Sequence, residues 1–139
     1  MMYQVIPTRV HGILDYLVGT LIIAAPWAFG FNKVQAAKWT TLSAGSSALL
    51  YSLCTNYEMG AFRLLSMNAH LIMDVLSGLL MAASPWLFGF ANEVWLPMVV
   101  IGAVEVFTAL MTKTTPELVE TKASKLSPRK RKQQPEYSF

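Results

Sequence analysis

Residues 11–31 (HGILDYLVGTLIIAAPWAFGF) and residues 70–90 (HLIMDVLSGLLMAASPWLFGF) decide the fold of this 139-residue chain. Aligned at an offset of 59 residues, the two stretches are identical at 12 of 21 positions. Chance does not produce such a match in so short a chain, so the sequence contains an internal repeat. Each copy is apolar over the roughly 20 residues that a helix needs to cross the ~30 Å hydrocarbon core of a bilayer.

Four apolar segments of this kind follow one another along the chain. They are residues 13–31, 36–54, 71–90 and 94–111, and they carry one ionisable group each: Asp15, Lys38, Asp74 and Glu105. A helix satisfies its own backbone hydrogen bonds in lipid, so we predict four transmembrane helices. Serine and threonine dilute the second segment, which makes it the weakest of the four. The alternative is a soluble helical bundle whose helices are all buried.

The composition agrees with a membrane protein. Hydrophobic residues make up 54% of the chain and charged residues 14%, with a mean hydropathy of +0.42. A soluble domain is about 25% charged, and a disordered chain carries still more charge and less apolar surface. The single cysteine, Cys54, excludes an intramolecular disulfide and a metal site built from several cysteines.

The distribution of basic residues predicts the orientation. With four spans, nine of the eleven lysines and arginines fall on the side of both termini and the middle loop, which predicts that this side is cytoplasmic. The tryptophans fall at the opposite ends of the predicted helices, as interfacial aromatic residues do: Trp27, Trp39, Trp86 and Trp95.

The repeat also predicts the domain organisation. Each copy holds two spans and therefore has the same orientation, which gives two parallel helical hairpins related by a pseudo-twofold axis along the membrane normal. We expect an all-α four-helix bundle. Its predicted parts are a cytoplasmic N-terminus (1–10), the first repeat (11–54), a cytoplasmic loop (55–69), the second repeat (70–112) and a cytoplasmic tail (113–139).

The predicted tail is polar and holds a basic run at residues 129–132. It lacks the apolar surface to fold alone, so we expect it to be flexible. Its basic residues are suited to contact anionic lipid, or they serve only to set the topology. A nucleic-acid partner is not expected, because the run has no folded platform.

Within each copy, a histidine, an aspartate and a glycine share one helix face at positions i, i+4 and i+8. These residues are His11, Asp15 and Gly19 in the first copy, and His70, Asp74 and Gly78 in the second. We expect the two repeat helices to pack against each other or against small-residue faces such as residues 43–48, because glycine permits close approach. The pseudo-axis would then bring the two His–Asp pairs together.

Two interpretations of these pairs stay open: a structural clasp at the helix ends, and a site that handles protons or cations. A divalent metal site is a third, weaker interpretation, because no HxxxH or ExxH spacing is present, and no metal ligand is assigned. Glu105 has no counterpart in the other copy. It is interpreted either as a protonated glutamate hydrogen-bonded to a serine or threonine of a neighbouring helix, or as a proton site or protomer contact.

The Pro-Trp pairs have a structural interpretation. Pro26 and Pro85 lack an N–H group and should kink or end the repeat helices, and Gly30 and Gly89 then permit the turn into the returning helix. Aromatic side chains should anchor this corner in the membrane interface: Trp27, Phe29, Phe31, Trp86, Phe88 and Phe90.

The segment SPWLFGF (84–90), with its partner APWAFGF (25–31), resembles the SPW repeat family of bacterial integral membrane proteins. The resemblance covers roughly residues 9–112. It implies a four-helix, two-repeat protein of the bacterial cytoplasmic membrane and carries no biochemical function to transfer. Ala25 stands where the motif has serine, so any role of that hydroxyl belongs to Ser84.

The sequence contains no pairing of a nucleophile with a base and no glycine-rich phosphate loop, so we expect neither an enzyme nor a bound cofactor. The favoured function is a structural or interaction subunit of the membrane, as a homo-oligomer or beside another membrane protein. The alternative is a small proton- or cation-conducting module that uses Asp15, Asp74 and Glu105. A membrane enzyme that acts on a lipid or quinone, with His11 and His70 as acid–base groups, comes third.

Overall fold

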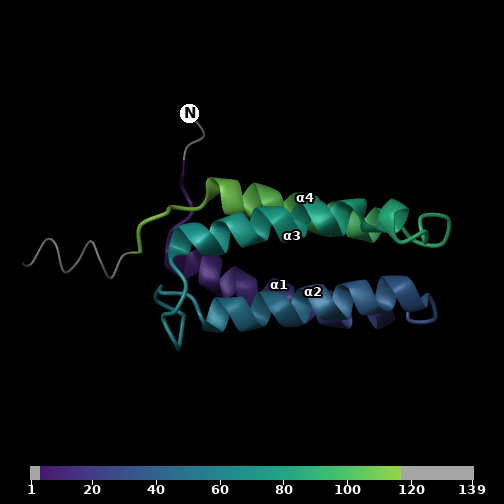
Figure 1. The fold of residues 1–139 in the computed structure, drawn as a ribbon, viewed down its shortest axis with the longest axis horizontal. Helices are drawn as coiled ribbons and strands as arrows, with labels where there is room; N and C mark the ends of the chain where they lie inside the picture. The colour runs from purple at the N-terminus through teal and green to yellow at the C-terminus, as the bar shows by residue number, and fades with distance from the viewer. Residues whose placement is uncertain (1–3, 117–139) are drawn as a thin grey trace, which may run out of the picture.

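The computed structural model describes residues 4–116 and contains four helices, with no strand in that range. They are α1 (Thr8–Ala28), α2 (Gln35–Leu53), α3 (Met67–Leu87) and α4 (Leu96–Met111). Figure 1 shows them as two antiparallel hairpins, α1 with α2 and α3 with α4, laid side by side. The all-helical prediction is confirmed. Of the predicted tail, only residues 113–116 belong to the described residues.

Two of these helices, α1 and α3, are long and apolar enough to cross a membrane. Helix α2 has 19 residues but carries the serines and threonines noted above. Helix α4 has 16 residues and is shorter than the predicted segment 94–111, because Trp95 has the non-helical φ of −131° and Pro97 opens the helix. Pro fits the first turn of a helix, where its missing N–H would have no partner in any case.

The helices of the repeat begin earlier than the repeat itself. α1 starts at Thr8 and α3 at Met67, three residues before the expected boundaries at 11 and 70. Ser66 caps α3, because its side chain accepts a hydrogen bond from the backbone N–H of Ala69 at 3.2 Å. As a result, each histidine lies in the first turn of its helix and each aspartate one turn further in.

Glycines bring the two helices of each hairpin close together. A Cβ atom added to Gly45 would lie 2.7 Å from the carbonyl oxygen of Gly19, and one added to Gly102 would lie 2.2 Å from that of Gly78. Each repeat helix therefore packs closely on its own returning helix. The expectation that α1 contacts the small-residue run of α2 is confirmed, whereas α1 and α3 do not pack along their lengths.

The end of the bundle where α1 and α3 finish is here called the Trp end. All four tryptophans lie there with 47–61% of their surface exposed. Phe31 and Phe90 do not join them, contrary to the prediction, and are buried at 4% and 2% exposure in the apolar core. Gly30 and Gly89 have φ angles of +74° and +73°, and this left-handed turn directs the next side chain inward.

The prolines of the motif lie inside the last helical turn. Each repeat helix continues for two residues beyond its proline. Pro85 cannot donate to the carbonyl of Met81, and Ser84 Oγ donates to that oxygen instead, at 2.7 Å. In lipid, freed backbone groups need such partners. The serine of the SPW motif thus replaces the hydrogen bond that the following proline removes, and Ala25 has no hydroxyl to do the same.

We expect Ser84→Ala to lower the free energy of unfolding by about 1–2 kcal/mol, because it leaves the buried carbonyl of Met81 without a donor. Thr20→Ala, at an exposed position of α1, is the control and should change it by less than about 0.5 kcal/mol. Unfolding of the purified protein in detergent measures both. Equal stability of the two variants would show that the serine has no such role.

Candidate functional site

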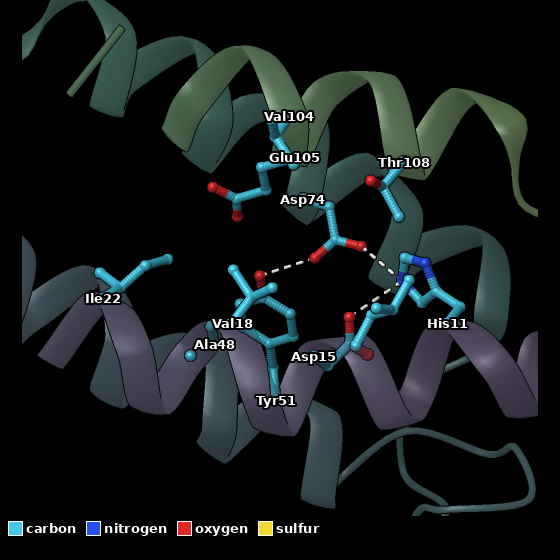
Figure 2. Close-up of a pocket in the computed structure, with 12 residues that line it drawn as sticks. His11, Asp15, Val18, Ile22, Ala48, Tyr51, Asp74, Val104, Glu105 and Thr108 are labelled. Carbon is cyan, nitrogen blue, oxygen red and sulfur yellow. Dashed lines mark hydrogen bonds and ion pairs between the residues drawn. The ribbon is translucent and has the colours of Figure 1, made fainter. Parts of the chain in front are cut away.

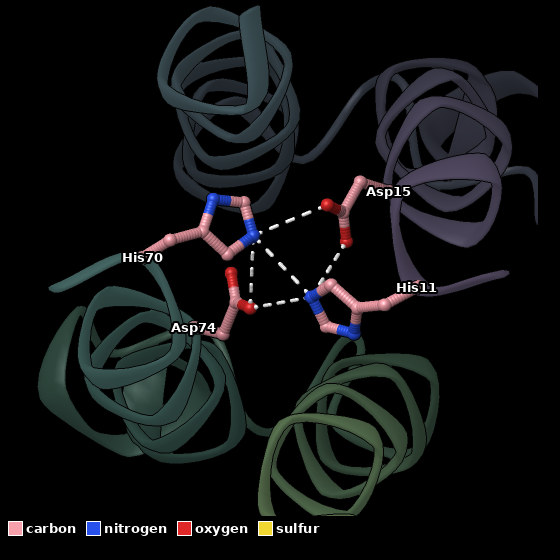
Figure 3. Close-up of side chains that lie close together, drawn as sticks. All are labelled: His11, Asp15, His70 and Asp74. Carbon is pink, nitrogen blue, oxygen red and sulfur yellow. Dashed lines mark hydrogen bonds and ion pairs between the residues drawn. The ribbon is translucent and has the colours of Figure 1, made fainter. Parts of the chain in front are cut away.

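Four side chains meet between α1 and α3 at the end of the bundle opposite the Trp end, here called the polar end. They are His11, Asp15, His70 and Asp74, and together they are called the His–Asp centre. Figure 2 shows His11 and Asp15 from α1 directed toward Asp74. Figure 3, along the bundle, shows α1 and α3 at opposite corners with all four side chains meeting between them. The expected meeting of the two pairs is therefore found.

Some contacts of the centre lie within one hairpin, and others join the two hairpins. His11 Nε2 lies 3.2 Å from Asp15 Oδ1 and 3.0 Å from Asp74 Oδ2. His70 Nε2 lies 3.1 Å from Asp15 Oδ2 and 3.2 Å from Asp74 Oδ2. The two Nε2 atoms are 3.3 Å apart. Each histidine thus contacts the carboxylates of both repeats.

The side chains of the centre are largely buried. His11, His70 and Asp74 are buried, with 2%, 0% and 4% of their surface exposed. The Asp15 side chain is 11% exposed. A buried carboxylate without compensating positive charge is costly, and two in one place are more so. The arrangement therefore has to hold positive charge between the two aspartates.

Two threonines determine which nitrogen of each imidazole carries a proton. Thr55 Oγ1 donates to the carbonyl of Tyr51 at 2.6 Å, so it accepts from His70 Nδ1 at 2.8 Å. A hydroxyl has one proton, so the Nδ1 atom must be the donor. Thr112 Oγ1 repeats this arrangement, donating to the carbonyl of Thr108 at 2.7 Å and accepting from His11 Nδ1 at 2.9 Å. In both histidines, Nδ1 faces a threonine and Nε2 faces the centre.

The threonines serve the histidine of the other hairpin. Thr55 follows α2 and contacts α3, whereas Thr112 follows α4 and contacts α1. Backbone bridges hold both crossings in register. Ile6 N donates to Met111 O at 3.0 Å, and Leu65 N donates to Cys54 O at 2.9 Å. The two hairpins are therefore interlocked at the polar end by equivalent contacts.

Further hydroxyls orient the carboxylates. Tyr51 donates to Asp74 Oδ1 at 2.7 Å, and Ser52 and Tyr57 donate to Asp15 Oδ2 at 3.3 and 3.4 Å. Burial, and then the negative charge of Asp15, raise the pKa of Tyr57 well above its ordinary value of 10. Because its pKa is raised, the hydroxyl of Tyr57, in the loop after α2, stays protonated and remains a donor.

Glu105 lies near the His–Asp centre but is not part of it. It accepts a hydrogen bond from Ser77 of the neighbouring α3, as the first of its two sequence interpretations expected. A cavity of about 90 Å³ lies inside the bundle, with Glu105 on one side and Asp15 and Asp74 on another. Figure 2 shows this cavity with Ile22, Val18 and Ala48 on its apolar side.

Sequence reasoning missed the residues that support the centre. Thr55, Thr112, Tyr51 and Tyr57 carry no motif, and the two threonines lie just beyond helix ends. One signal was present. The threonines occupy equivalent places after α2 and α4, so the alignment of the weaker second half of each repeat would have paired them. The prolines and tryptophans of the motif lie at the Trp end, far along the helices from this centre.

The protein is a helical bundle with apolar outer surfaces, built from two similar hairpins that share one buried polar centre. The family model of the SPW repeat domain matches residues 9–112, and the chain belongs to that family. No curated protein and no solved structure matches the chain.

Proposed function

We propose that this chain is a structural or interaction subunit of the bacterial cytoplasmic membrane, in which the His–Asp centre holds two transmembrane hairpins together. The observation that carries the proposal is the crossing of contacts, because His11 contacts Asp74 and His70 contacts Asp15. The proposal includes four spans, two parallel hairpins related by a pseudo-twofold axis, and cytoplasmic termini.

Four spans are supported by the way the helices are grouped. Helices α1 and α3 are long and apolar enough to cross, and α2 and α4 run back beside them in the same bundle. At 16 residues, α4 is about 24 Å long, and Trp95 extends it into the interface. The four tryptophans lie at one end of the bundle, and the distribution of lysine and arginine along the sequence predicts that the opposite, polar end is cytoplasmic.

Cysteine labelling tests this topology in intact cells. In a Cys54→Ser background, single cysteines at Asn32 and Asn92, in the loops of the Trp end, should react with a membrane-impermeant maleimide. A cysteine at Asn56, in the middle loop, should react only after the cells are permeabilised. Protection of Asn32 or Asn92, or labelling of Asn56 in intact cells, would contradict four spans with this orientation.

The role of a clasp is supported by where the hairpins contact each other. Within each hairpin one pair of glycines brings the two backbones close together, whereas the contacts between the hairpins are fewer and run mainly between α2 and α3. The His–Asp centre and the two backbone bridges therefore supply the directional contacts between the halves. The centre is enclosed by protein and exposes no nucleophile, which agrees with a structural role better than with catalysis.

Asp74→Asn should lower the free energy of unfolding by about 3–5 kcal/mol, because it leaves positive charge at the centre without its buried partner. Glu93→Gln, an exposed acid in the α3–α4 loop, is the control and should leave stability unchanged within about 0.5 kcal/mol. Thermal unfolding in detergent measures both variants. A fully stable Asp74→Asn variant would remove the basis for a clasp.

A partner in the membrane is supported by the outer face of α2. Ser43, Ser46 and Ser47 are exposed there, on the least apolar of the four helices. Small and hydroxyl-bearing residues are enriched where transmembrane helices contact one another. We therefore place the interaction surface, with a second copy or another membrane protein, on α2.

The cavity beside Glu105 favours a second candidate, a cation-conducting module. A cation inside it would have Glu105 on one side and the His–Asp centre on the other. The cavity of about 90 Å³ is too small to form an aqueous path across a ~30 Å hydrocarbon core. Conduction would need several chains.

We expect proteoliposomes that contain the chain to show no more K⁺ or proton flux than empty liposomes, because no continuous polar path is formed. Flux measured with an ion-sensitive dye tests this. Flux that is present in the wild type and lost in a folded Glu105→Gln variant would replace the clasp with the conducting module.

A further inference from the structure

We propose that His11, Asp15, His70 and Asp74 bind one divalent transition-metal ion, of which Zn²⁺ is the best fit. This inference rests on the proposed clasp, since it identifies what the clasp holds. It goes beyond the sequence interpretation, which assigned no metal ligand because the spacing within one helix matches no known ligand motif. The ligand set becomes visible only when the two helices are brought together.

The geometry of the four ligand atoms carries the argument. Zn²⁺ binds imidazole nitrogen and carboxylate oxygen at about 2.0–2.2 Å in a tetrahedron, which places neighbouring ligand atoms about 3.3 Å apart. The two Nε2 atoms lie 3.3 Å apart, and their distances to the carboxylate oxygens are 3.0–3.2 Å. All four ligand atoms lie within 4.8 Å of one another. The two histidines face different oxygens of Asp15, so a carboxylate oxygen has to move by about 1 Å for one atom of each residue to surround a single ion.

The threonines prepare both histidines for a metal. Because Thr55 and Thr112 accept from Nδ1, a neutral imidazole at either position presents its Nε2 lone pair to the centre. Metal-binding histidines commonly donate their second ring N–H to a fixed acceptor in this way. The ring planes are 76° apart, so the two imidazoles meet at their edges and do not stack. Figure 3 shows both Nε2 atoms pointing at the same space.

Charge favours a dication over protons. Protonation of both histidines would set two N–H groups against each other across the 3.3 Å between the Nε2 atoms. A dication instead accepts both lone pairs and neutralises the charge of the two carboxylates. The hydroxyls of Tyr51 and Tyr57 also hold the two carboxylates facing the centre.

The ligand set also narrows the class of metal. Imidazole nitrogen suits Zn²⁺, Fe²⁺, Cu²⁺ and Ni²⁺, and carboxylate oxygen suits the harder members of this series. Four protein ligands in a closed shell are typical of a structural zinc site, because catalytic zinc sites keep a position open. A structural ion is also what a clasp between two hairpins requires.

The test uses the full-length chain, purified in detergent with an affinity tag that lacks histidine. We expect elemental analysis to find close to one Zn²⁺ per chain, and removal with EDTA followed by Zn²⁺ addition to raise the melting temperature. Co²⁺ in place of Zn²⁺ should give the visible absorption of a four-coordinate site. A metal content near zero, with no effect of Zn²⁺ on melting, would overturn the proposal.

Two threonine variants test metal binding without removing any of the four ligands. Thr112→Val keeps all four ligands and should weaken Zn²⁺ binding about 10–100-fold, because it removes the partner that orients His11. Thr20→Val is the matched control, since Thr20 makes the same kind of bond to the carbonyl four residues back but contacts no histidine, and it should bind Zn²⁺ normally.

The Asp74→Asn variant distinguishes failure of the metal proposal from failure of the clasp proposal. If the variant is destabilised with and without Zn²⁺ and the wild type binds no Zn²⁺, the clasp stands and the metal proposal fails. If the variant is as stable as the wild type under both conditions, the clasp itself fails. Destabilisation of the variant only when Zn²⁺ is present supports the metal as the element that joins the hairpins.

Discussion

Two carboxylates lie buried at one end of an apolar bundle, and the need to compensate their charge governs how the two hairpins pack. Asp15 and Asp74 cannot lie there without positive charge between them and donors around them. The Nε2 atoms of His11 and His70 face the place where that charge has to lie, and hydroxyl groups from the end of α2 and the middle loop supply the donors. Every one of these partners has to be directed at the same point, which fixes how the two hairpins lie.

The two copies of the repeat supply the same residue types to the His–Asp centre, but the centre is not fully symmetric. Each copy provides one histidine, one aspartate and one threonine, and each threonine serves the other copy. The donors to the carboxylates differ: Tyr51 serves Asp74, whereas Ser52 and Tyr57 serve Asp15. The two aspartates are therefore equivalent by position and distinct by environment. Glu105 deepens this asymmetry, because the first repeat has no acid at the corresponding place in α2, where Ala48 lines the cavity.

Much of the fold could be predicted from the sequence, and the reasons are specific. The repeat, the apolar lengths and the i, i+4 spacing predicted four helices in two hairpins and the meeting of the His–Asp pairs. The inward turn of Phe31 and Phe90 could not be predicted, because it depends on the φ angles of two glycines. Neither could Thr55 and Thr112, because a threonine beyond a helix end has many uses and only the packed structure shows a histidine above it.

The SPW motif and the His–Asp centre both provide partners for polar groups that are buried in an apolar bundle, and they do so at opposite ends of it. At the Trp end, a proline frees a buried carbonyl and the preceding serine, where present, supplies the missing donor. At the polar end, the histidines contact the two carboxylates, and the threonines accept hydrogen bonds from the histidines while donating to carbonyls at the ends of α2 and α4. Polar groups inside an apolar bundle gain no help from water, so each needs a partner from the chain. Neither hairpin alone carries the full set of partners for its own aspartate and histidine, because the threonine for each histidine comes from the other. The two copies therefore depend on each other at the polar end, whereas the hydrogen bond of Ser84 lies within its own helix.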